Sequence, residues 1–126
     1  MITVIKNIHV YAPEDLGIKD VVITSNKIEG IYDNVEIPNN FVAIEIIDGK
    51  GKLLYPGFID NHVHVMGGGG EGGYSTRTPE MHISELTKAG ITTLVGCIGT
   101  DGVCRSINSL IAKVKGLKEE GISAYA

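Results

Sequence analysis

The sequence has few of the features that mark specialised classes of protein. Its two cysteines, Cys97 and Cys104, are too few for the disulfide framework of a small secreted protein. No apolar run approaches the roughly 18 residues that cross a membrane, and residues 1–6 lack the basic start and apolar core of a signal peptide. We therefore expect a reduced, cytoplasmic protein that makes no use of a membrane.

Positive charge is also scarce. Eleven lysines and arginines stand against 15 aspartates and glutamates, and the basic residues are scattered, so no nucleic-acid surface is expected. Glycine, in contrast, is abundant: the chain has 17 glycines in 126 residues, and six of them fall between residues 67 and 73. Because this enrichment is local, it indicates one special loop and not a disordered chain.

The first part of the chain, residues 1–54, predicts a β-rich N-terminal domain. β-branched residues are frequent, and breaking residues separate them into short runs. No helical period is visible in this part. We expect an all-β, sandwich-like segment with strands at residues 2–11, 21–24, 28–32 and 41–47.

Residues 55–126 have a different pattern, in which strands and helices alternate. Strands are expected at residues 58–65, 91–98 and 122–126, the second covered on both faces because its run is nearly continuously apolar. Thr78 and Ser106 are predicted to cap two helices, the first with Pro79 in its first turn and an end near Ala89. This alternation predicts an α/β segment with parallel strands. Three strands are too few to close a barrel, so we expect the N-terminal piece of a longer polypeptide.

The most informative motif is Asp60-x-His62-x-His64, which ends the first of these strands. Side chains alternate along a strand, so all three are expected on one face, with next-but-one residues roughly 6.5–7 Å apart. Two imidazoles at this spacing can bind one metal, each nitrogen about 2.1 Å from it. Asp60 is then placed to orient one of the imidazoles. A bare His-x-His is common, but here a Pro-Gly turn and an apolar lead-in precede it.

This context resembles a known family. Residues 51–64, which read Gly-Lys-Leu-Leu-Tyr-Pro-Gly-Phe-Ile-Asp-x-His-x-His, are similar to the signature of the amidohydrolase superfamily. Residues 62–73 and 76–80, with residues 95–101, resemble one branch, the isoaspartyl dipeptidases. The resemblance implies that residues 55–126 begin a (β/α)8 barrel. It also implies hydrolysis of the isopeptide bond of β-aspartyl dipeptides.

The resemblance further implies a centre with two zinc ions, in which His62 and His64 bind one ion. Glu71 would hold the free α-amino group of the dipeptide substrate. The other metal ligands and the aspartate that shuttles protons are expected beyond Ala126, so no catalytic residue is assigned within this chain, which we expect to be inactive alone. The full-length protein is expected to be a homo-oligomer. The residues implied in substrate binding are Gly69, Gly70, Glu71 and Thr100.

Other interpretations remain open. A dihydroorotase- or hydantoinase-like enzyme, which opens a cyclic amide, shares the histidine motif, so the loop at residues 67–73 is the feature that discriminates. The chain taken by itself is also compatible with an inactive structural fragment, because two histidines leave zinc short of ligands. A dinucleotide site is disfavoured because residues 74–77 separate the glycines from the next helix.

Four further polar residues could contribute to a site. His9 and His82 are expected to be an ordinary strand residue and a surface residue. Asp101 and Arg105 flank the loop that follows the second strand of the α/β segment. This loop lies at the end of the strand where a barrel enzyme carries its active site, so both residues are candidates for a supporting role.

Overall fold

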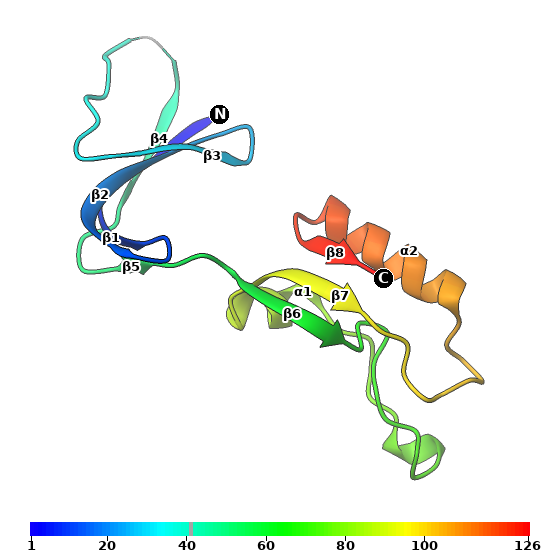
Figure 1. The fold of residues 1–126 in the computed structure, drawn as a ribbon. Coiled ribbons are helices and arrows are strands. Elements are labelled where there is room, and N and C mark those ends of the chain that lie inside the picture. The colour runs from blue at the N-terminus through cyan, green and yellow to red at the C-terminus, as the bar shows by residue number, and fades with distance from the viewer. Residues whose placement is uncertain (41) are drawn as a thin grey trace. The chain divides into compact units, whose positions relative to one another are not determined.

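The structure, a computed structural model, describes residues 1–40 and 42–126. It divides into two compact units, Met1–Pro56 and Gly57–Ala126, whereas the predicted boundary was placed between residues 54 and 55. The first unit is built of strands and the second of strands and helices (Figure 1). None of the helices in the described ranges is both long enough and apolar enough to cross a membrane.

The first unit contains one five-stranded sheet. Its order is β3-β2-β1-β4, and β5 also pairs with β1. β1, β2 and β3 are antiparallel neighbours, while β4 and β5 run parallel to β1. The β-rich prediction is confirmed, and a second packed sheet stays a prediction. The predicted strand at residues 41–47 begins at Phe41, which lies outside the described residues. The strands are β1 (Ile2–Tyr11), β2 (Asp15–Thr24), β3 (Lys27–Tyr32), β4 (Ile44–Asp48) and β5 (Leu53–Leu54).

One buried carboxylate ties this sheet to the segment that follows it. Asp20 is 3% exposed and accepts hydrogen bonds from the Lys6 ammonium group and from the backbone amides of Asn7 and Val35, at 2.9 and 2.8 Å for the amides. Burial raises the pKa of Asp20, but these hydrogen bonds outweigh it and hold the pKa below its ordinary value. Asp20 is therefore charged although it is buried.

The second unit contains a parallel three-stranded sheet in the order β6-β7-β8. The predicted parallel alternation of strands and helices is confirmed. A 3-10 turn, η1, lies in the long connection between β6 and α1, and it is seen at the tip of that connection in Figure 1. The elements are β6 (Phe58–Val63), η1 (Tyr74–Thr76), α1 (Ile83–Lys88), β7 (Ile91–Gly96), α2 (Ile107–Glu119) and β8 (Ser123–Tyr125).

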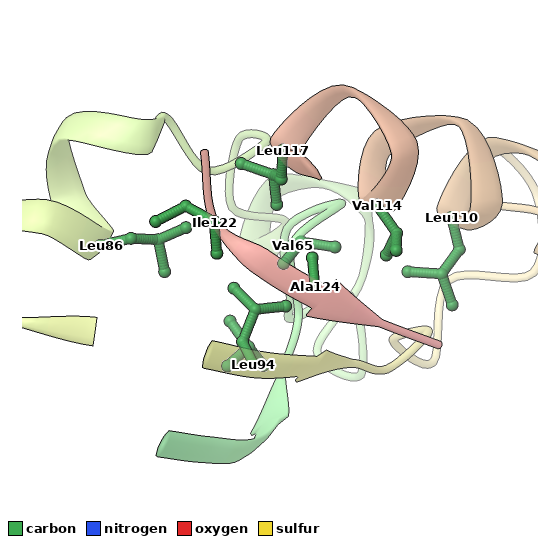
Figure 2. Close-up of a cluster of buried hydrophobic side chains, with 9 residues drawn as sticks. Val65, Leu86, Leu94, Leu110, Val114, Leu117, Ile122 and Ala124 are labelled. Atoms are coloured by element: carbon green, nitrogen blue, oxygen red, sulfur yellow. The ribbon is translucent and has the colours of Figure 1, made fainter. Parts of the chain in front are cut away.

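The core of this unit lies between the sheet and its helices (Figure 2). Of the four residues that recur at helical spacing in α2, Leu110, Val114 and Leu117 are buried, whereas Ile111 is 42% exposed. A Cβ atom at Gly96 would come within 3.1–3.2 Å of Val114 and Leu110, so the missing side chain lets α2 lie close to β7. The core residues are Val63, Val65, Leu86, Leu94, Leu110, Val114, Leu117, Ile122 and Ala124.

The opposite face of the parallel sheet is open in the described residues. Ile59, Val95 and Tyr125 share this face through the register of the strands, and they are 74%, 36% and 55% exposed. The expectation that the strand from residue 91 is covered on both faces is therefore wrong for this chain. The apolar run was a poor guide because Thr92 and Thr93 interrupt it and only one face meets the helices.

The first helix begins later than predicted. The sequence favoured Thr78 as the N-cap with Pro79 in the first turn, but α1 begins at Ile83 and is preceded by His82. The backbone amide of His82 donates to Glu85 Oε2 at 2.7 Å, which satisfies one of the free donors at the start of the helix. His82 is exposed, as expected of a surface residue.

Hydrogen bonds to the glycine loop account for the late start. The Thr78 amide donates to the Gly68 carbonyl at 2.9 Å, and the Thr78 hydroxyl accepts from the Gly68 amide at 2.6 Å. Met81 also donates its amide to the Val65 carbonyl, at 3.1 Å. Backbone groups that hold the chain against this loop are not free to close helical turns, so the helix starts only after them.

We predict that Leu117→Ala lowers the free energy of unfolding by about 2–4 kcal/mol, because it leaves a cavity in a core where this side chain is 1% exposed. Ile111→Ala on the same helix is the matched control, because Ile111 is 42% exposed, and it should cost less than about 1 kcal/mol. Urea unfolding of both variants measures the difference. Equal losses would contradict the assigned core.

Candidate metal and substrate site

The histidine pair lies at the carboxyl end of β6. His62 is in the strand and exposed, whereas His64 follows the last strand residue and is half-buried. The two rings meet edge to face, with centroids 5.1 Å apart and an interplanar angle of 83°. Two imidazoles that bind one tetrahedral zinc ion through nitrogens at about 2.1 Å place their ring centroids about 5 Å apart. The observed spacing is therefore compatible with one shared ion.

The surroundings of the pair also fit a metal ion. Nδ1 of His64 is buried and has no hydrogen-bond partner among the described residues, a costly state for a ring nitrogen unless it binds something. Both rings line a surface pocket of about 390 Å³ together with Asp60 and Glu85. Within the described ranges no three His, Cys, Asp or Glu residues are grouped closely enough to hold a metal. The pair by itself therefore supplies fewer ligands than a zinc ion usually takes.

Asp60 contacts the backbone of the motif. The register between β6 and β7 shifts between Asp60 and Val63, so the regular alternation on which the prediction relied is interrupted inside the motif. Asp60 Oδ1 accepts a hydrogen bond from the His62 amide at 3.1 Å. The role of Asp60 in orienting an imidazole stays a prediction.

The glycine loop, residues 67–73, folds back on the segment that leads to α1. Gly67 and Gly69 have φ values of 84° and 72°, a region that favours glycine. A Cβ atom at Gly67 would lie 2.3 Å from the Thr78 carbonyl oxygen, and one at Gly69 would lie 2.3 Å from the Thr76 carbonyl oxygen. These glycines therefore allow two stretches of backbone to approach more closely than any side chain permits.

Two predicted substrate residues meet at this loop. Thr100, which follows β7, donates its hydroxyl hydrogen to Glu71 Oε1 at 2.8 Å. The backbone amide of Glu71 and then the Thr100 hydroxyl hold the pKa of the Glu71 carboxyl below its ordinary value. Glu71 is exposed and anionic at neutral pH, so it can bind an ammonium group.

The histidine pair and Thr100 do not line the same pocket in the described part of the chain. Gly70 and Thr100 line a second surface pocket, of about 230 Å³, which also includes Arg77 and Asp101. Asp101 is 8% exposed, and its Oδ2 lies 2.5 Å from Arg77 Nε. Arg77 was not among the predicted site residues, because a single arginine between two threonines carries no local signal of its partner.

Backbone donors fix the Asp101 carboxylate from the other side. The amides of Val103 and Cys104 donate to its Oδ1, at 2.9 and 3.3 Å. The Val103 amide is the largest influence that holds the pKa of Asp101 below its ordinary value, and it outweighs the opposing effect of burial. Asp101 therefore stays charged, and its carboxylate holds the turn at the start of the loop that leads to α2.

Comparison with known proteins shows what this chain is similar to. Residues 45–101, which include the histidine motif and the glycine loop, match the profile of the amidohydrolase family. The structure resembles the crystal structure of a β-aspartyl dipeptidase from Fervidobacterium islandicum in complex with the dipeptide β-Asp-Leu, with 48% identity and a TM-score of 0.88 over 98% of this chain and 32% of that one. The predicted resemblance to the isoaspartyl dipeptidases is therefore confirmed.

Relatives with other activities are also similar. A dihydroorotase from Listeria innocua is 36% identical over 115 residues, which cover 89% of this chain and 25% of the relative. The dihydropyrimidinase from Brevibacillus agri is 29% identical, with a TM-score of 0.62 over 89% of this chain and 23% of that one. The chain thus spans about a quarter to a third of the length of these proteins.

We predict that His62 and His64 take up one zinc ion together. Addition of Zn²⁺ to the 126-residue chain should shift the imidazole NMR signals of both residues in parallel. His62→Asn should weaken zinc uptake at least about tenfold. Loss of a residue that only hydrogen-bonds to a metal ligand already lowers metal affinity about 10–100-fold. His82→Asn is the matched control, because asparagine can still cap α1, and it should change nothing. Signals of His62 and His64 that move independently would contradict a shared ion.

Proposed function

We propose that a longer protein containing this chain hydrolyses the isopeptide bond of β-aspartyl dipeptides and that it uses zinc. The observation that carries this proposal is the pairing of Glu71 with Thr100 at 2.8 Å beside the glycine loop. The 48% identity to a protein crystallised with β-Asp-Leu supports it.

The charge of Glu71 favours this substrate over a cyclic amide. A β-aspartyl dipeptide carries a free α-ammonium group next to its α-carboxylate, and an anionic side chain can hold the ammonium group by a charge-assisted hydrogen bond. A dihydropyrimidine or a hydantoin has no ammonium group, so the Glu71 carboxylate would meet no cation. Dihydroorotase-like activity is the second candidate, because the curated dihydroorotases align with most of this chain.

We further propose that residues 57–126 are the first β/α units of a (β/α)8 barrel. In such barrels the active site lies at the carboxyl ends of the strands and in the loops that follow them. His62 and His64 lie at that end of β6, and Thr100 follows the same end of the parallel strand β7. This placement supports the barrel proposal.

In this proposal the residues of the chain bind and orient, and His62 and His64 would hold one zinc ion. Bound zinc would supply a Lewis acid that polarises the scissile carbonyl and lowers the pKa of water. Glu71 fixes the amino end of the dipeptide, and Thr100 holds the Glu71 carboxylate in place. Gly70 lines the pocket beside Thr100 and leaves room there for the dipeptide, because it has no side chain. The missing side chain of Gly69 instead lets the loop lie against Thr76.

We predict that two chimeras separate the candidate functions. Residues 1–126 would replace the matching segment of the Fervidobacterium β-aspartyl dipeptidase in one chimera and of the Listeria dihydroorotase in the other. The first should hydrolyse β-Asp-Leu, and the second should lose dihydroorotase activity, because the loop carries Glu71. The 126-residue chain alone should turn over neither substrate. Dihydroorotase activity in the second chimera without dipeptidase activity in the first would overturn the proposal.

We predict that Glu71→Gln in the dipeptidase chimera raises the KM for β-Asp-Leu about 10- to 100-fold, because a hydrogen bond to a charged group is lost. Zinc content, measured by mass spectrometry, should not change. Glu119→Gln, at an exposed position of α2, is the matched control for the loss of a negative charge. An unchanged KM at unchanged zinc content would refute the assigned role of Glu71.

A further inference from the structure

A buried cation lies behind the glycine loop. Arg105 directly precedes Ser106, the N-cap of α2, and is 6% exposed. Burial of a guanidinium group is costly unless its N–H donors find acceptors. The proposed chemistry does not use this side chain, so its burial requires another explanation.

The guanidinium donates to four backbone carbonyls. It thereby joins two arms of the chain, residues 66–69, which follow the histidine pair, and residues 76–78, which lead to α1. Nε donates to the Met66 carbonyl at 3.0 Å. Nη2 donates to the carbonyls of Gly68 and Thr78, at 3.1 and 3.0 Å, and Nη1 to that of Gly69 at 3.4 Å. Three of these acceptors lie on the arm that leaves the histidine pair, and Thr78 lies on the arm that returns to α1.

Missing side chains leave space for this cation. A Cβ atom at Gly67 would lie 2.9 Å from Arg105 Nη2, and one at Gly99 would lie 3.2 Å from Nη1. Glycine at these two positions therefore brings both loops close to the guanidinium.

A short path connects Arg105 to Glu71. The Gly69 carbonyl lies 3.3 Å from Thr100 Oγ1, and the same hydroxyl lies 2.8 Å from Glu71 Oε1. A hydroxyl group has one hydrogen to donate, and the shorter distance favours Glu71 as its acceptor. Arg105 supplies the Gly69 carbonyl with a second donor, which leaves the Thr100 hydroxyl free for Glu71.

We propose that Arg105 is a positioning residue: its guanidinium gathers the carbonyls of the glycine loop and so holds Glu71 at Thr100, ready for the ammonium group of the substrate. This inference rests on the proposed function for the role of Glu71. The geometry requires arginine, because a planar fork with five donors spans four carbonyls, whereas a lysine ammonium group is a point with three.

The first test uses the 126-residue chain and needs no activity. In Arg105→Lys and Arg105→Met, the amides of Gly68, Gly70 and Thr78 should exchange hydrogen at least about tenfold faster, while the amide of Leu94 in β7 keeps its rate. Lys115→Met, an exposed loss of positive charge on α2, is the control and should change neither. Unchanged loop exchange, or equal acceleration at Leu94, would overturn the proposal.

The second test uses the dipeptidase chimera and asks whether Arg105 acts through Glu71. Arg105→Lys should raise the KM for β-Asp-Leu at least about tenfold, with a smaller effect on kcat and unchanged zinc content. In the Glu71→Gln background the same change should raise KM less than about twofold, because the coupled contact is already lost. Additive effects would refute the positioning role. A chimera without dipeptidase activity would refute the proposed function, and the exchange experiment would still decide on Arg105.

Discussion

The glycine loop imposes the main constraint on this structure. Between the end of β6 and the start of α1 the chain has no regular structure except one 3-10 turn, so its backbone donors and acceptors need partners outside a ladder or a helix. Carbonyls of this loop accept from the buried Arg105 guanidinium, and its amides at Gly68 and Gly70 donate to the hydroxyls of Thr78 and Thr76. The loop is held by these side chains.

The same hydrogen bonds shape the elements on either side. The Val65 carbonyl binds the Met81 amide, and the Val65 amide binds the Val63 carbonyl at 3.0 Å, so β6 ends at Val63 and the chain turns directly after the histidines. Residues 78–81 stay outside α1 because they face the loop. A short strand and a short helix are therefore consequences of how the loop is anchored.

Charge in this region is arranged in order from the interior to the surface. The Arg105 cation is buried, the Asp101 carboxylate is buried beside Arg77, and the Glu71 carboxylate is exposed. Backbone amides and one hydroxyl keep both carboxylates ionised. A site with a fixed surface anion suits a cationic group of a substrate, and the neighbouring imidazoles suit a metal ion.

The sequence by itself determined the features whose signals are local. Ser106 as a cap predicted α2, β-branched residues predicted β1, and the order of residues 60–64 placed two imidazoles beside each other. Tertiary structure alone decided where α1 starts and what Arg105 binds, because the partners of Arg105 lie 27 to 39 residues away along the chain. Hydrogen bonds between distant segments follow no sequence period. In the sequence alone, Thr78, which anchors a loop, cannot be told from a threonine that caps a helix.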